Sequence, residues 1–167
     1  MESIDAIADN IEAHVLLTSQ LEMICKCYKI PLEASPLYNF RDALSHYVLR
    51  YEATTDEEKI AQEASIKEHL FRGTKDIFVS ILYAMEERVI NALKKATPGK
   101  QEQDFRKLLH EYKRLEIEIR RNTESTVIRS LTPSVVSLND LIEETKKVFE
   151  KYLVPFLINK NYSPPPN

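Results

Sequence analysis

An arginine and a histidine stand five positions apart in segment 38–47, which reads YNFRDALSHY. The guanidinium of Arg41 is permanently charged and offers a planar fork of N–H donors, which suits it to bind a phosphate and to stabilise charge developing there. The imidazole of His46 can give or take a proton near neutral pH. Arg41 and His46 are therefore the first candidates for chemistry in this chain, and their role depends on the elements around them.

Two polar neighbours could support this pair. Asp42 precedes His46 by one helical turn, so its carboxylate could orient the imidazole; an ordinary surface pair is the alternative. Ser45 borders the same helix face. Because Arg41 and His46 lie about 140° apart around a helix, one chain does not easily aim both at one phosphate. A twofold partner would supply the missing copy.

A second polar group occurs near the middle of the chain. Glu68, His69, Arg72 and Asp76 share the polar side of a long predicted helix. His69 and Arg72 could line the same cleft as the arginine–histidine pair, as supporting residues. The alternative is a solvated face on which Glu68, Arg72 and Asp76 form ion pairs one turn apart.

Composition and hydrophobic spacing predict the elements that position these residues. Glu, Lys, Leu, Ile and Ala are abundant and favour helix, whereas the two glycines, Gly73 and Gly99, are too few for folds rich in tight turns. Apolar residues three and four apart predict helices over 3–29, 36–53, 55–95 and 101–122, with a last helix that begins at Thr132 or Ser137. The predicted fold is an all-α antiparallel bundle of about five helices, a single domain over 1–161 with a disordered proline-rich tail over 162–167.

The helix over 36–53 carries the arginine–histidine motif. Its apolar stripe, predicted to face the core, consists of Leu37, Phe40, Leu44, Val48 and Tyr51. This orientation places His46 almost opposite the core, beside Leu49. A leucine there suggests a second buried surface, such as a dimer contact or a cleft, although single exposed leucines are common.

Local signals give the helix ends. Ser35 is the predicted N-cap of the second helix, and Thr55 opens a capping box for the third. The third helix could break near Gly73. The sequence TPGK at 97–100 predicts a turn, and Pro155 should kink or end the last helix.

Charge and cysteine content restrict the class of protein. The net charge of −3 argues against coating nucleic acid through bulk charge but allows a local basic cleft. Cys25 and Cys27 point about 200° apart on a helix, which predicts reduced thiols in a cytoplasmic protein. A metal site would need a second pair of ligands at suitable spacing, and the sequence shows none. The acidic N-terminus predicts no signal peptide, and the apolar run 77–85 is too short to span a membrane.

The segment from Arg41 to His46, in an all-helical chain of this size, resembles the HEPN (higher eukaryote and prokaryote nucleotide-binding) domain family. The resemblance implies a helical bundle that commonly dimerises. It also implies a metal-independent endoribonuclease without a cofactor, with Arg41 and His46 catalytic, that cleaves RNA as a toxin or phage-defence effector. Its partners would be RNA, a second copy of the chain, and an antitoxin or nucleotidyltransferase.

Two other interpretations stay open. Some family members are catalytically inactive and bind a protein partner, such as a nucleotidyltransferase, or a nucleotide. The third interpretation is a helical scaffold in which the motif is a coincidence, because a short pattern of this kind also arises by chance.

Overall fold

The structure, a computed structural model, describes residues 4–32, 34–122 and 128–160. Within these ranges the chain is helical and contains no β-strand, which confirms the all-α prediction. The elements are α1 (Ile4–Tyr28), α2 (Ser35–Glu52), α3 (Asp56–Leu93), α4 (Lys100–Arg121), the 3-10 helix η2 (Ile128–Leu131) and α5 (Thr132–Lys160). The proline-rich end at 162–167 lies outside the described residues.

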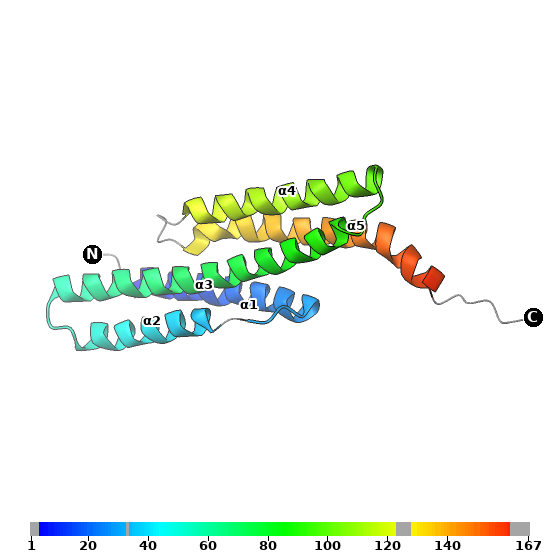
Figure 1. The fold of residues 1–167 in the computed structure, drawn as a ribbon. Coiled ribbons are helices and arrows are strands. Elements are labelled where there is room, and N and C mark those ends of the chain that lie inside the picture. Colours follow the sequence, from blue (N-terminus) through cyan, green and yellow to red (C-terminus); the bar gives the residue numbers. More distant parts are fainter. Residues whose placement is uncertain (1–3, 33, 123–127, 161–167) are drawn as a thin grey trace, which may run out of the picture.

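Helix α3 is the central element. Its 38 residues span about 57 Å at 1.5 Å per residue. Helices α1 and α2 lie along one side of it, and the antiparallel pair α4 and α5 covers the other side (Figure 1). One long helix thus belongs to both halves of the bundle.

The core lies mainly between the second half of α3 and the α4–α5 pair. The most deeply buried large side chains there include Phe78, Phe105 and Tyr112, each with 0% of its surface exposed. The Tyr112 hydroxyl lies 2.9 Å from the Thr145 hydroxyl, and burial raises the pKa of Tyr112 to about 12. This polar pair is therefore neutral and satisfied inside an apolar core.

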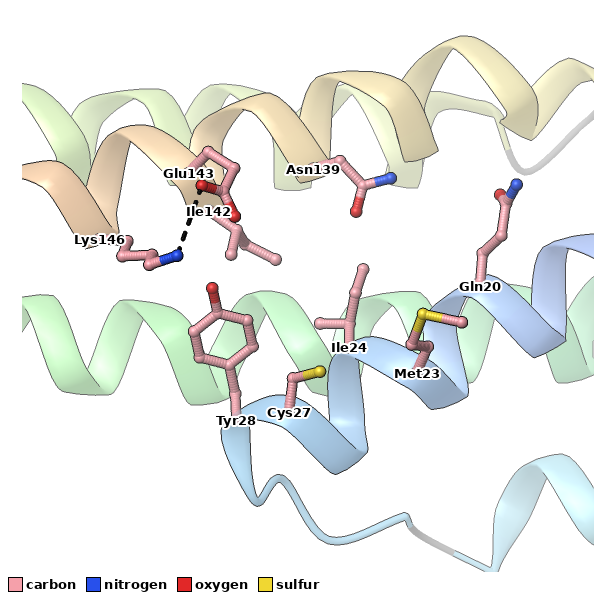
Figure 2. Close-up of a pocket in the computed structure, with 9 residues that line it drawn as sticks. All are labelled: Gln20, Met23, Ile24, Cys27, Tyr28, Asn139, Ile142, Glu143 and Lys146. Atoms are coloured by element: carbon pink, nitrogen blue, oxygen red, sulfur yellow. Dashed lines mark ion pairs between the residues drawn. The ribbon is translucent and has the colours of Figure 1, made fainter.

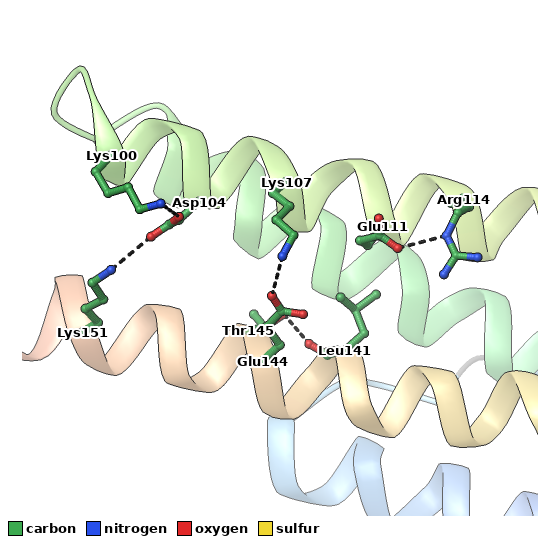
Figure 3. Close-up of polar contacts among 9 residues, drawn as sticks. All are labelled: Lys100, Asp104, Lys107, Glu111, Arg114, Leu141, Glu144, Thr145 and Lys151. Carbon is green, nitrogen blue, oxygen red and sulfur yellow. Dashed lines mark hydrogen bonds and ion pairs between the residues drawn. The ribbon is translucent and has the colours of Figure 1, made fainter.

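Ion pairs join the outer edges of α4 and α5. Lys107 Nζ lies 3.3 Å from Glu144 Oε1, and Lys151 Nζ lies 3.2 Å from Asp104 Oδ2 (Figure 3). Such exposed pairs contribute at most about 1 kcal/mol each, so apolar burial stabilises this half of the bundle.

Helix α3 starts at the predicted capping box and continues through Gly73. The Thr55 hydroxyl accepts from the Glu58 amide at 3.2 Å, and the Glu58 carboxylate accepts from the Thr55 amide, also at 3.2 Å. The suggested break at Gly73 is wrong, because α3 is a single helix over Asp56–Leu93. Gly73 instead permits close approach of α2: a Cβ added there would lie 3.3 Å from Asn39 Cβ.

Other boundary predictions have mixed outcomes. Ser35 is not the N-cap of α2; that position is Ala34, and the Ser35 hydroxyl donates to Asp76 Oδ2 at 2.6 Å. The turn at 97–100 is confirmed, with Gly99 at φ 114° directly before α4. Helix α5 starts at Thr132, runs past Pro155 to Lys160 and bends in its last turns (Figure 1).

The predicted orientation of α2 is wrong. Most of its apolar stripe is exposed, although the Phe40 ring stacks on His14 of α1 with the centroids 5.8 Å apart. Ala43 is the one buried residue of the helix. We call this stripe, with the adjacent Tyr47, the α2 apolar face; its members are Leu37, Phe40, Leu44, Tyr47, Val48 and Tyr51, between 42% and 88% exposed. The physical reason is the surface that α2 packs against. The first half of α3 presents polar side chains to α2, so the polar side of α2 faces α3. Leu49 is 47% exposed, so within one chain no second buried surface covers it.

Candidate functional site

The candidate site is a row of polar side chains between α2 and the first half of α3, and two histidines form its centre. The rings of His46 on α2 and His69 on α3 stack with their centroids 5.2 Å apart and their planes 21° apart. Both side chains are half-buried. The structure therefore brings together the motif histidine and the histidine predicted to share its cleft.

Amide side chains orient both rings. His46 Nδ1 lies 2.7 Å from Gln62 Oε1, and His69 Nδ1 lies 3.4 Å from Asn39 Oδ1. Because an amide oxygen only accepts, each ring donates its Nδ1–H and keeps its Nε2 lone pair for another proton. Sequence reasoning missed Gln62 and Asn39, since neither amide stands out in the sequence by type or spacing.

Asp42 contacts Arg41 rather than the His46 ring. Arg41 donates from Nε at 3.0 Å and from Nη2 at 2.7 Å to Asp42 Oδ1. The hydrogen bond from Arg41 lowers the pKa of Asp42, and the charges of Arg41, His69 and His46 lower it further. Asp42 therefore accepts from Arg41 and fixes neither imidazole ring.

Arg41 contacts its helical neighbours Asp42 and Tyr38 rather than the histidine pair. Its side chain is 69% exposed and its guanidinium lies over the Tyr38 ring, 5.5 Å from the ring centroid. Ser45 donates to the Arg41 carbonyl at 3.1 Å and makes no contact with the rings. One chain therefore supplies the two imidazoles side by side, whereas the Arg41 side chain leaves α2 about 140° around the helix from His46.

The row continues from the histidines in both directions. Toward the end of α2, Arg50 Nε lies 2.6 Å from Glu63 Oε1 in an ion pair that is largely buried. In the other direction, Asn39 donates to Asp76 Oδ2 at 3.1 Å, and Ser35 donates to the same oxygen.

The alternative proposed for the second polar group is correct in part. Arg72 forms an ion pair with Glu68 on the exposed side of α3. Asp76 does not continue that chain, because it accepts from Ser35 and Asn39 on α2. Arg72 is accordingly not in contact with the histidine rings.

A separate hollow of about 680 Å³ lies between α1 and α5. Met23, Ile24, Tyr28 and Ile142 make much of its wall apolar, and the exposed Cys27 also lines it (Figure 2). Its charged residues, Glu143 and Lys146, pair with each other at 3.9 Å. None of the residues of the polar row between α2 and α3 lines this hollow, so it is not the candidate site.

Two further properties concern the described residues as a whole. None of the helices in that part of the chain is both long and apolar enough to cross a membrane. The same residues include no cluster of three or more His, Cys, Asp or Glu side chains arranged to hold a metal ion.

Comparison of the chain with protein-family models, with curated proteins and with solved structures finds no match.

Proposed function

We propose that this protein is a metal-independent endoribonuclease of the HEPN type, acting in the cytoplasm as a toxin or phage-defence effector. The observation that carries the proposal is the stacked pair of His46 and His69, 5.2 Å apart, next to the Arg-x4-His motif. Two imidazoles can supply the general base and the general acid that RNA cleavage without a metal requires.

The chemistry needs one proton taken and one proton given. A neutral imidazole removes the proton of a ribose 2′-hydroxyl, whose oxygen attacks the adjacent phosphorus. A protonated imidazole gives its proton to the 5′-oxygen that leaves. The products are a 2′,3′-cyclic phosphate and a 5′-hydroxyl, and the enzyme's total number of protons is unchanged.

The pentavalent phosphorus of the transition state carries negative charge on its oxygens, and a cation is needed to stabilise that charge. Arg41 is suited to it, because its fork can donate two hydrogen bonds to one phosphate. Since Arg41 and His46 of one chain diverge, we propose that a second copy of the chain supplies the guanidinium. Arg41 borders the α2 apolar face, so pairing of two copies through this face places both arginines at one interface.

The size of the α2 apolar face supports such pairing. Six large apolar side chains are 42–88% exposed on one side of a single helix. A fully buried aromatic side chain buries roughly 150–250 Å², so the exposed parts of these six side chains add up to an apolar surface on the order of 600 Å². That is the upper end of what monomers leave exposed, and it approaches the roughly 800 Å² that each partner buries in a standard interface.

The test is cleavage of a structured RNA in EDTA by purified protein. We expect wild type to release products ending in 2′,3′-cyclic phosphate, and His46→Ala and Arg41→Ala to lose at least a hundredfold in rate. His69→Ala should fall similarly if the pair acts as a unit. His110→Ala is the matched control, since His110 is exposed on α4, away from the site. Full activity of His46→Ala would exclude the proposal.

A second candidate function is a non-enzymatic module that binds a protein partner, such as an antitoxin or a nucleotidyltransferase. The α2 apolar face favours it, because a partner helix could cover the same surface that a second copy would. A stable complex with the product of a neighbouring gene, without RNA cleavage by wild type, would support this candidate over the nuclease.

A further inference from the structure

A hollow lined by cations lies beyond the Asp76 end of the polar row. It has a volume of about 350 Å³ and forms where the start of α2, the middle of α3 and the end of α4 meet. Arg72 and Lys75 of α3 and Arg120 of α4 line it, with Asp76 as the one carboxylate in its wall. The hydroxyls of Ser35, Ser80 and Tyr83 also line it.

Lys75 is the informative residue of this hollow. Burial and the nearby charge of Arg120 lower the pKa of its ammonium. Within the described part of the chain, Lys75 makes no hydrogen bond and no ion pair. Asp76, the nearest acidic side chain of the wall, already accepts from Ser35 and Asn39 through one oxygen. An anion in the hollow would supply the counter-charge that Lys75 lacks.

The two arginines keep donors for such an anion. Arg72 uses Nη2 for Glu68, and Arg120 uses Nε for Glu116 and Nη2 for the Tyr83 hydroxyl. A guanidinium carries five N–H donors, so each retains several.

The hollow is close to the histidine pair. Lys75 follows His69 by six residues, about 9 Å along α3. Asn39 connects the two places directly, because it contacts His69 through Oδ1 and Asp76 through Nδ2. A strand of RNA with its reacting phosphate at the histidines would carry an adjacent phosphate toward this hollow.

From these observations we infer that the hollow of Arg72, Lys75 and Arg120 binds a backbone phosphate of single-stranded RNA next to the one that is cleaved. The inference rests on the proposed function, and it assigns the substrate a second contact that the motif does not provide. The ligand chemistry is a phosphodiester monoanion, held by charge and by hydrogen bonds rather than by base recognition.

The test uses a 2′-O-methylated single-stranded RNA, which lacks the attacking hydroxyl and cannot be cleaved by this chemistry. Its binding to the full chain is measured by fluorescence anisotropy over a range of salt concentrations. Lys75→Gln and Arg120→Gln should each weaken binding on the order of tenfold, similarly for RNAs of different sequence. Each should also reduce the slope of log affinity against log salt by about 0.7.

Two controls separate a local effect from a general one. Lys147→Gln removes an exposed lysine of α5 that does not line the hollow, and it should bind as wild type does. Thermal unfolding of Lys75→Gln should match or exceed wild type, because the substitution removes a partly buried and unpaired charge. A clear loss of stability in Lys75→Gln moves the test to Arg120→Gln, whose side chain is half-exposed.

The outcomes distinguish this site from the nuclease itself. If wild type cleaves RNA and both glutamine variants bind and cleave as wild type does, the phosphate site is wrong and the nuclease proposal stands. If no RNA is cleaved but binding depends on Lys75 and Arg120, the nuclease proposal fails and the site stands. If inorganic phosphate binds in a Lys75-dependent way and RNA does not bind, the assignment to RNA is overturned.

Discussion

His14 on α1 is the histidine whose ionisation the fold opposes most directly. It is 8% exposed, and its Nδ1 lies 2.7 Å from the hydroxyl of Thr74. That hydroxyl donates to the Leu70 carbonyl at 2.9 Å, so it accepts from the Nδ1–H of His14. Burial lowers the pKa of His14 below its ordinary 6.5. The ring is therefore a neutral structural donor.

Acidification should destabilise the protein through His14. Below pH 6.5 the unfolded chain protonates this ring while the folded chain resists protonation, so the free energy of unfolding falls as the pH drops. The contribution of His14 to stability is fully present above pH 6.5. We expect urea unfolding at pH 7.5 and pH 5.5 to show a smaller loss for His14→Gln than for wild type. His110→Gln should keep the wild-type difference, since His110 is exposed. Equal losses in all three proteins would contradict this role.

At the scale of the elements, Gly73 sets how closely α2 and α3 approach. A Cβ at this position would lie 3.3 Å from Asn39 Cβ and 3.4 Å from the Pro36 carbonyl oxygen. A helical glycine costs about 1 kcal/mol relative to alanine, so its position inside α3 is explained by packing rather than by helix preference. The residues it brings together are those that orient the histidine pair.

Substitution at Gly73 should separate helix preference from packing. Gly73→Ala gains about 1 kcal/mol of helix preference but requires a shift of a few tenths of an ångström, so we expect little net change in stability. Gly73→Leu should destabilise by about 1–3 kcal/mol and displace α2, because overpacking forces the backbones apart. Chemical denaturation measures the first effect, and the NMR shifts of the His46 and His69 rings measure the second. Gly99→Leu would not serve as a control, because its φ of 114° disfavours any side chain.

Hydrophobic spacing was sufficient to locate the helices but not to orient all of them. On α4, Phe105, Tyr112 and Ile119 are buried as their spacing predicts. On α2 the same rule failed, because periodicity identifies an apolar stripe without identifying what faces it. The neighbouring surface of α3 carries Gln62 and Glu63, which pair with the polar side of α2.

The candidate site could likewise be predicted only in part. That His69 could line the same cleft as His46 was one of two interpretations of the sequence, beside a solvated ion-paired face, and in the structure the two rings stack. The separation of Arg41 from His46 followed from helix geometry. Asn39 and Gln62 could not be found from the sequence, because their roles depend on tertiary contacts between α2 and α3.

At the scale of the whole molecule, the α2 apolar face should determine the oligomeric state. We expect wild type to sediment as a dimer in analytical ultracentrifugation and Leu44→Glu to sediment as a monomer, since a charge at the centre of the face disfavours pairing. The stability of the monomer should be unchanged, because Leu44 is 52% exposed within one chain.

A matched substitution tests whether this effect belongs to the face. Val136 on α5 is 55% exposed and lies outside the α2 apolar face, so Val136→Glu should leave the dimer intact. If the protein is a nuclease, the ribonuclease activity of Leu44→Glu should fall in proportion to its dimer fraction. If wild type is monomeric at all concentrations, two copies of the chain do not pair through the α2 apolar face.

Helix α2 buries a single residue, Ala43, whereas α3 buries fourteen. The free energy that holds α2 in place is therefore a small fraction of that holding the rest of the bundle. Its amide hydrogens should exchange with solvent through detachment of this one helix, well before the chain unfolds. The arginine–histidine motif thus lies on a helix that buries little apolar surface, and a partner that covers α2 would slow the exchange of its amides.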